Sequence, residues 1–172
     1  MNIMELLSDS SKLTAIHAGN VAMQKPEIIP LILKLALENK HQYSMRAANT
    51  IEKLDFNRPE LVKPFYTEII EALPAIEIQG VQRCFLKLLV RHTNIKNEET
   101  LCSLLNFSFD KLSSPTAEVA VKVYAMEILY HISKVEPDLK NELVSVIKAQ
   151  MTDGSSGFKS CGSRIIKACQ RL

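Results

Sequence analysis

The stretch Val121-Lys122-Val123-Tyr124-Ala125-Met126-Glu127-Ile128-Leu129-Tyr130-His131-Ile132 carries the pattern that decides the fold. Counting from Val121, the residues at +4, +7, +8 and +11 are also apolar, and this spacing places them along one side of an α-helix. A similar stripe starts at Tyr43, Val81 and Phe158, so the four starting positions lie 38, 40 and 37 residues apart. A period near 40 is typical of stacked helix pairs. We therefore predict an all-α fold, an α-α superhelix (solenoid) of about four helix pairs.

Each stripe is predicted to be the second helix of a pair, because a start signal for another helix precedes it. Proline or an acidic residue in a first turn marks these starts, as at Pro26-Glu27 and Pro59-Glu60. Pro30 and Pro64 fall inside first helices and predict a bend in each. We expect nine helices and no strands in a single domain over residues 1–172, with these segments: an N-terminal capping helix in 1–24, and helix pairs in 25–55, 59–92, 97–133 and 136–172.

Three stripe positions depart from the apolar pattern. Thr50, His92 and Gly162 stand where an apolar side chain is expected. Because of His92 and Gly162, the second and fourth pairs are where the predicted register is most open to correction.

The composition is that of an ordinary globular protein, with 47% apolar and 23% charged residues in a chain of 172. Only five glycines leave little material for a β-rich fold with many tight turns. No apolar run approaches the roughly 18 residues of a membrane span. Residues 1–5 show no basic segment leading into an apolar core, so we predict a cytoplasmic protein without a membrane partner.

No motif of known catalytic or metal-binding chemistry is present in the sequence. The four cysteines form no CxxC pair, and no histidine lies at helical ligand spacing from another. We interpret the cysteines as buried, reduced thiols. No glycine-rich loop suited to phosphate follows a strand pattern. We therefore predict a non-enzymatic protein with no cofactor and no metal.

Two segments resemble the HEAT family of α-helical repeats. The run Pro26-Glu27-Ile28-Ile29-Pro30-Leu31-Ile32-Leu33-Lys34-Leu35-Ala36-Leu37 looks like a HEAT first helix, and residues 121–129 look like a second helix. The resemblance covers roughly residues 25–172. It implies a solenoid whose second helices line the concave face.

More narrowly, residues 120–127 and 154–159 resemble a small bacterial HEAT-like family, some members of which carry an adenylosuccinate lyase label. The signature loop of that lyase superfamily continues from Gly-Ser-Ser to Met-Pro and then to Lys and Asn. Here Gly154-Ser155-Ser156 is followed by Gly157-Phe158-Lys159-Ser160. We therefore interpret residues 154–156 as a turn between helices.

Charge divides unevenly between the two kinds of helix. The predicted second helices (40–54, 79–92, 116–133 and 155–172) hold 11 basic and three acidic residues, whereas the rest of the chain holds ten basic and 16 acidic residues. One of the acids, Glu127, lies among apolar residues and is a further candidate binding residue. The predicted binding residues are Arg46, Lys53, Arg83, Lys87, Arg91, Lys122, Glu127, Arg164 and Lys167.

A basic concave face attracts an acidic protein or peptide, which is the partner that we predict. The first alternative is binding to a nucleic-acid backbone, in the manner of HEAT-like DNA alkylation repair proteins, which the family resemblance implies. The second is that these cations are merely solvated and cover apolar surface with their stems. Arg83, Lys87 and Arg91 are spaced to share one helix face, so changing all three to Glu is expected to keep the fold and abolish partner binding. No oligomeric state is assigned.

Overall fold

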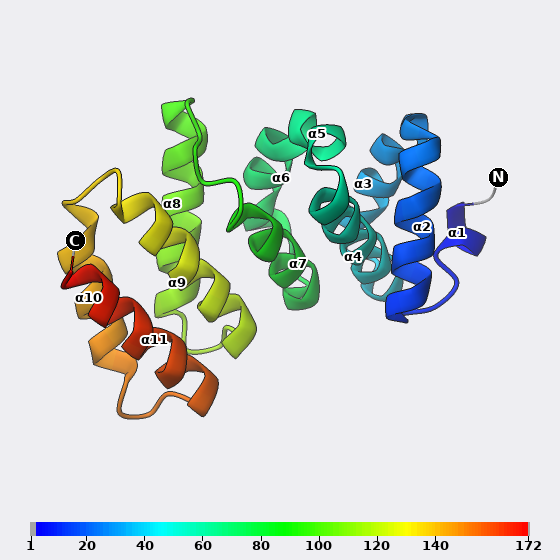
Figure 1. The fold of residues 1–172 in the computed structure, drawn as a ribbon. Helices are drawn as coiled ribbons and strands as arrows, with labels where there is room; N and C mark the ends of the chain where they lie inside the picture. Colours follow the sequence, from blue (N-terminus) through cyan, green and yellow to red (C-terminus); the bar gives the residue numbers. More distant parts are fainter. Residues whose placement is uncertain (1–2, 172) are drawn as a thin grey trace. The chain divides into compact units, whose positions relative to one another are not determined.

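The structure is a computed structural model that describes residues 3–171. The parts of the predicted domain and capping helix that fall on Met1, Asn2 and Leu172 lie outside the described residues. Over residues 3–171 all regular structure is α-helical or 3₁₀-helical and no strand is present, which confirms the all-α prediction (Figure 1). The chain divides into two compact units, residues 1–88 and 89–172, and each is described by itself.

The first unit begins with two helices where one capping helix was predicted. Residues 7–11 separate them, since Ser11 is the N-cap of a new helix and its Oγ accepts a hydrogen bond from Thr14 N at 3.1 Å. The elements of this unit, in chain order, are α1 (Ile3–Leu6), α2 (Lys12–Gln24), η1 (Pro26–Ile28), α3 (Ile29–Leu37), α4 (His41–Asn57), α5 (Pro59–Val62), η2 (Lys63–Phe65), α6 (Tyr66–Ala72), η3 (Leu73–Ala75) and α7 (Gln79–Leu89).

Both prolines inside the first helices lie in or near a 3₁₀ segment. Pro64 lies within η2, and Pro30 is the second residue of α3, which directly follows η1. A proline has no N–H with which to continue the α-helical hydrogen-bond ladder. At the first site Ile29 N closes a tighter turn onto the Pro26 carbonyl instead. The first helix of the second pair is therefore divided into α5, η2 and α6, which accounts for a further departure from nine helices.

Helix α4 forms the centre of the first unit and packs against both α2 and α3. Small residues on α2 permit the close approach: Ala15, Ala18 and Ala22 are buried, and the backbone of Leu54 lies against Gly19. Thr50 is fully buried in this contact and its Oγ1 donates to the Arg46 carbonyl at 3.0 Å. A hydroxyl satisfied within its own helix is tolerated in a core, which explains the polar residue in the first stripe.

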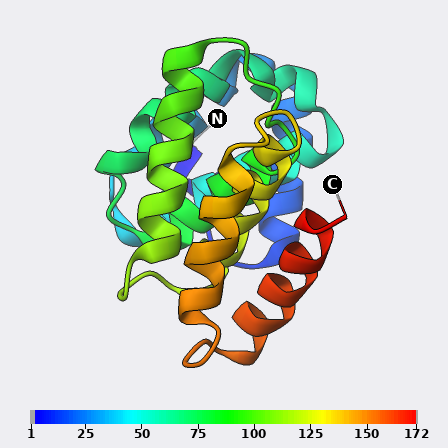
Figure 2. The same ribbon diagram turned by 90° about the vertical axis from the view of Figure 1, so that its left-hand side faces the viewer.

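The second unit contains α8 (Glu98–Ser113), α9 (Val119–Ser133), α10 (Leu139–Gln150) and α11 (Ser156–Cys169). Helix α9 packs against the other three, and Figure 2 shows α10 and α11 side by side, joined at one end by residues 151–155. Gly162 lies where they meet, because a Cβ there would stand 2.8 Å from Ile147 Cγ2. The unexpected glycine in the fourth stripe is thus required by close helix packing. The core of the unit comprises Leu112, Met126, Leu129, Leu143, Ile147, Phe158, Cys161 and Ile165.

The second stripe ends earlier than predicted. Helix α7 stops at Leu89, so His92 lies outside the helix and is not a stripe residue. Its backbone N–H instead closes a turn onto the Leu89 carbonyl. The predicted pair boundary at residue 92 is therefore corrected to residue 89.

Candidate partner-binding residues

Eight of the nine predicted binding residues lie on the second helices of the pairs. In the first unit Arg46 and Lys53 are on α4, and Arg83 and Lys87 are on α7. The residues of the second unit are Lys122 and Glu127 on α9, Arg164 and Lys167 on α11, and Arg91 in the turn after α7.

Arg91 does not share a helix face with Arg83 and Lys87. The helix ends two residues before it, and residues 90 and 91 form a turn. The spacing rule for helix faces therefore does not apply to it, and the expectation that these three cations form one stripe was wrong.

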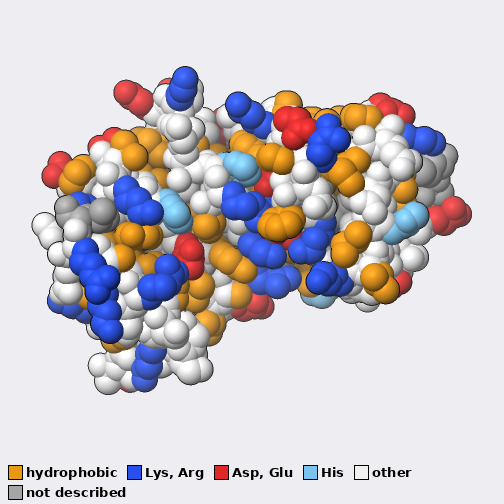
Figure 3. Space-filling view, in the orientation of Figure 1, with side chains coloured by type: hydrophobic (Ala, Val, Ile, Leu, Met, Phe, Trp, Pro, Cys, Tyr) orange, Lys and Arg blue, Asp and Glu red, His pale blue; other side chains and the backbone are white. Residues whose placement is uncertain are grey.

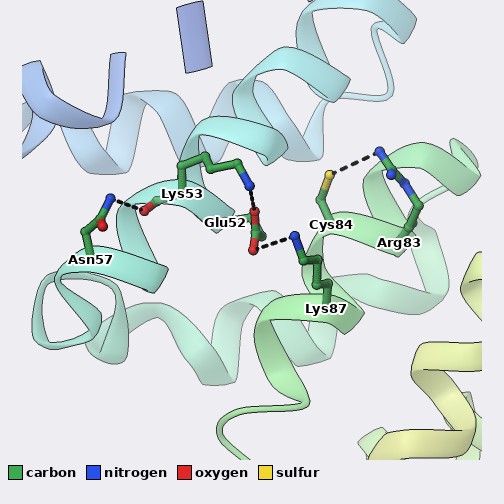
Figure 4. A network of polar contacts seen from close by, with 6 residues as sticks. All are labelled: Glu52, Lys53, Asn57, Arg83, Cys84 and Lys87. Carbon is green, nitrogen blue, oxygen red and sulfur yellow. Dashed lines mark hydrogen bonds and ion pairs between the residues drawn. The ribbon is translucent and has the colours of Figure 1, made fainter. Parts of the chain in front are cut away.

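The first unit contains a carboxylate held between two lysines, which we call the Glu52 cluster (Glu52, Lys53, Arg83, Cys84 and Lys87; Figure 4). Glu52 on α4 is only 2% exposed. Lys53 Nζ lies 2.7 Å from its Oε2, and Lys87 Nζ, on α7, lies 3.1 Å from its Oε1. Two predicted binding residues therefore neutralise an internal acid and join one second helix to the next.

Burial acts to raise the pKa of Glu52, because a low-dielectric environment disfavours the charged form. Hydrogen bonds from the ammonium groups of Lys53 and Lys87 outweigh that effect and hold the pKa below its ordinary value. Glu52 is therefore ionised at neutral pH, and both lysines contribute to the lowering of its pKa.

The second unit contains a related arrangement, the Glu127 cluster (Glu127, Cys161 and Arg164). Arg164 Nη2, on α11, lies 2.6 Å from Glu127 Oε1 on α9. Cys161 lies between them, with its Sγ 3.7 Å from Glu127 Oε1 and 3.5 Å from Arg164 Nη2. The Glu127 side chain is 25% exposed and that of Arg164 56% exposed, so this ion pair is in contact with water.

The cysteines in the two clusters are poorly suited to act as nucleophiles. Burial raises the pKa of the Cys84 thiol, and burial together with the charge of Glu127 raises that of Cys161. A thiol with a raised pKa stays protonated and unreactive. The prediction of burial is wrong for Cys102, which is exposed on α8, and only partly met by Cys169, which is half-buried.

Arg46 is engaged within the first unit. Its Nη1 donates to the carbonyls of Leu7 and Ser8 at 3.0 and 2.8 Å, and its guanidinium lies 5.5 Å from the ring centroid of Tyr43. These contacts attach the segment between α1 and α2 to α4. The observed role of Arg46 is therefore to hold the start of the chain.

The repeated helix pairs agree with a family comparison. The family model described as a HEAT repeat domain matches residues 4–169, nearly the whole chain. The chain is a HEAT repeat protein. HEAT repeats typically mediate protein interaction and are generally non-enzymatic, which makes this chain a helical scaffold for protein interaction. Comparisons with curated proteins and with solved structures gave no match.

The described part of this HEAT repeat protein gives two further findings. None of its helices has the length and apolar character that crossing a membrane requires. Among the same residues, no three His, Cys, Asp or Glu side chains are grouped so that they could hold a metal ion.

The second helices of the HEAT repeats remain the basic ones when the observed boundaries are used. The second helices α4, α7, α9 and α11 carry eight Lys or Arg and three acids. The first α-helices of the pairs carry four Lys or Arg and seven acids; these helices are α3, α5, α6, α8 and α10. The three acids are each engaged: Glu52 and Glu127 in their clusters, and Asp55 by a hydrogen bond from Tyr66 Oη at 2.5 Å. Figure 3 shows Lys and Arg side chains gathered over parts of each unit.

Four predicted cations have no carboxylate partner within 4.0 Å among the described residues: Arg46, which is held by backbone carbonyls, and Arg83, Lys122 and Lys167, which are not. Arg83 and Lys167 are exposed, and the one polar contact of Arg83 is with Cys84 Sγ at 4.0 Å. Lys122 is half-buried and donates to Gln150 Oε1 at 2.7 Å. Their charge is therefore available to a partner.

Sequence reasoning missed Glu52 and Gln150 as members of these polar groups. Glu52 was counted only as one acid among many bases. A signal was present, since Glu52 follows Ala48 by four residues and precedes Asp55 by three, a second buried stripe on α4. Nothing in the sequence marked Gln150, because its contact with Lys122 joins residues 28 apart.

Proposed function

We propose that this HEAT repeat protein binds acidic protein segments, and that Arg83, Lys122 and Lys167 are among the cations that contact them. The observation that carries the proposal is the combination of a basic second-helix layer with acids that are already engaged. Glu52, Asp55 and Glu127 already have internal partners, so none of them neutralises Arg83, Lys122 or Lys167. A surface with uncompensated cations attracts and orients an acidic partner.

The residues that test this proposal differ from the trio chosen from the sequence. Lys87→Glu would place a second carboxylate beside Glu52, from which Lys87 Nζ is 3.1 Å away. That variant would destabilise the first unit, so a loss of binding could not be distinguished from a loss of fold. Charge reversal at Arg83, Lys122 and Lys167 leaves the ion pairs of both clusters in place, because the one contact of Arg83 within the Glu52 cluster is with Cys84 Sγ.

The experiment measures fluorescence anisotropy of a labelled, blocked hexaglutamate peptide and of a labelled DNA duplex, each at several salt concentrations. We expect the peptide to bind and the variant carrying Arg83→Glu, Lys122→Glu and Lys167→Glu to lose binding. A matched control with Lys12→Glu, Lys34→Glu and Lys148→Glu, on α2, α3 and α10, makes the same change of charge and should retain it. Circular dichroism confirms that both variants are folded.

Two outcomes contradict the proposal. Equal loss in the two triple variants would mean that only net charge matters. Tight binding to the duplex that falls steeply with salt, without binding to the peptide, would assign the surface to a nucleic-acid backbone instead.

A further inference from the structure

The second unit contains a pocket to which the proposed function assigns no role. Its volume is about 400 Å³, within the range of small-ligand sites. Its lining comes from α9, α10, α11 and the loops at their ends, and includes Pro115, Val119, Lys122, Gln150, Asp153 and Phe158. The pocket therefore lies wholly within residues 89–172.

Lys122 is the cation of this pocket, and its surroundings are unlike those of the paired cations on other second helices. Lys53, Lys87 and Arg164 each meet a carboxylate at 2.6 to 3.1 Å. Lys122, although half-buried, has only the amide oxygen of Gln150 and the face of Phe158, whose ring centroid is 5.9 Å from Nζ.

Gln150 fixes the position of this ammonium group. Its Oε1 accepts from Lys122 Nζ at 2.7 Å, while its Nε2 donates to the Leu112 carbonyl at 2.8 Å. The amide is thus held in place by α8. The ammonium group of Lys122 has three N–H donors, and after the bond to Gln150 two of them remain to be satisfied. A partly desolvated ammonium group gains most from an anion that completes its hydrogen bonds.

The lining also selects the kind of anion. Asp153 is also a lining residue and forms no ion pair with Lys122, so its negative charge opposes a doubly charged group more than a singly charged one. The apolar walls from Pro115, Val119 and Phe158 suit short methylene groups rather than a bare ion.

We infer that this pocket receives the carboxylate side chain of a glutamate from the acidic partner, with Lys122 as the ion-pairing residue. The inference rests on the proposed function and names the feature of the partner that this unit recognises. The carboxylate pairs with Lys122 Nζ, and the glutamate methylenes pack against Val119 and Phe158.

The test is an NMR titration of the isotopically labelled protein with blocked hexaglutamate, with blocked hexaglutamine as the neutral control. We expect shifts in the backbone amides of Gln150, Ser155 and Phe158 with the first peptide only. Lys122→Met keeps the stem over Phe158 and should weaken binding by about tenfold or more. Lys148→Met, an exposed lysine on α10 outside the pocket lining, is the matched control and should change affinity by less than about twofold.

A second variant protects the test against a loss of fold. Val119→Glu places a carboxylate three residues before Lys122 on the same helix, where the two side chains can pair. It should compete with the peptide and remove the pocket shifts in a folded protein. Val135→Glu, at a residue 77% exposed beyond α9, makes the same change elsewhere and should leave them.

The outcomes separate this inference from the proposed function. Peptide binding that shifts Arg83 and Lys167 but not the pocket, and that survives Lys122→Met, would overturn the inference and leave the proposed function in place. The absence of any peptide binding would overturn both. Pocket shifts produced by inorganic phosphate at lower concentrations than by N-acetylglutamate would overturn the choice of a carboxylate.

Discussion

The two units build a similar polar contact with different exposure. In each, a carboxylate on one second helix meets a cation on another, and a buried cysteine precedes that cation by three residues: Cys84 before Lys87, and Cys161 before Arg164. Glu52 is 2% exposed and has two lysines, whereas Glu127 is 25% exposed and has one arginine. A buried charge must be compensated almost completely, while water compensates the rest of an exposed one. The Glu52 cluster is therefore expected to stabilise its unit, and the Glu127 cluster is expected to matter much less.

The largest effect is expected from Glu52→Gln. The substitution keeps the shape but removes the charge that Lys53 and Lys87 share. Breaking a buried pair in this way should lower the free energy of unfolding by about 2 to 3 kcal/mol, reduced from the fully buried case because the lysines can turn toward water. Urea unfolding measures the change. A loss below about 0.5 kcal/mol would contradict the distinction between the clusters.

The pH dependence sharpens the same comparison. The pKa of Glu52 is lowered in the folded protein, so the unfolded chain takes up its proton first as the pH falls. The stabilising contribution is therefore complete above the ordinary carboxyl pKa, about 4.3. It is lost as the pH falls through the lowered folded-state value. The difference in unfolding free energy between the wild type and Glu52→Gln should be constant above about pH 5.5 and shrink below about pH 4. A difference that stays the same at low pH would show that Glu52 is not the group responsible.

A second contrast between the units lies in their helix contacts. A Cβ at Gly162 would stand 2.8 Å from Ile147 Cγ2 and 3.1 Å from Met151 Sδ, while one at Gly19 would meet its nearest atom, Leu54 N, at 3.7 Å. Gly162→Ala should destabilise by about 1 to 2 kcal/mol through overpacking. Gly19→Ala, the matched control, should lie within about 1 kcal/mol of the wild type because its contact is ordinary and alanine favours helix. Thermal unfolding of the two variants decides the point, and equal melting temperatures would contradict it.

The smallest effect is expected from Glu127→Gln. Arg164 is 56% exposed and can turn to water once its partner loses its charge. Exposed ion pairs contribute about 0.5 kcal/mol, so the free energy of unfolding should fall by no more than about 1 kcal/mol. Raising the salt concentration should reduce the effect further. If this variant lost as much stability as Glu52→Gln, exposure would not be what separates the two clusters.

Much of the fold could be predicted because it follows from side-chain spacing along single helices. The stripes of the third and fourth pairs lie on α9 and α11 as expected. The errors arose where a local hydrogen bond decided the outcome. Ser11 starts α2 and thereby divides the predicted capping helix, and α7 ends at Leu89 although the sequence pattern continues to His92.

The candidate site was less predictable, because two cations on the same helix can differ in whether they meet an acid. On α7, Lys87 is paired with Glu52 and Arg83 has no carboxylate partner. Lys87 and Arg164 stand six residues after the first stripe residue of their helices and both are paired. Their acids do not follow the repeat: Glu52 stands nine residues after Tyr43, and Glu127 six after Val121. The rule that locates the cations therefore does not locate the acids.

The sequence by itself determined the helix pairs, their period and the concentration of Lys and Arg on the second helices. These properties depend on the 3.6-residue turn of a single helix, which can be read along the chain. Only the tertiary structure decided which cations are occupied by Glu52 and Glu127, and which, like Lys122, are left without a carboxylate. Pairing depends on how neighbouring helices are placed along and around one another, and contacts between residues some 30 positions apart leave no mark in the local pattern.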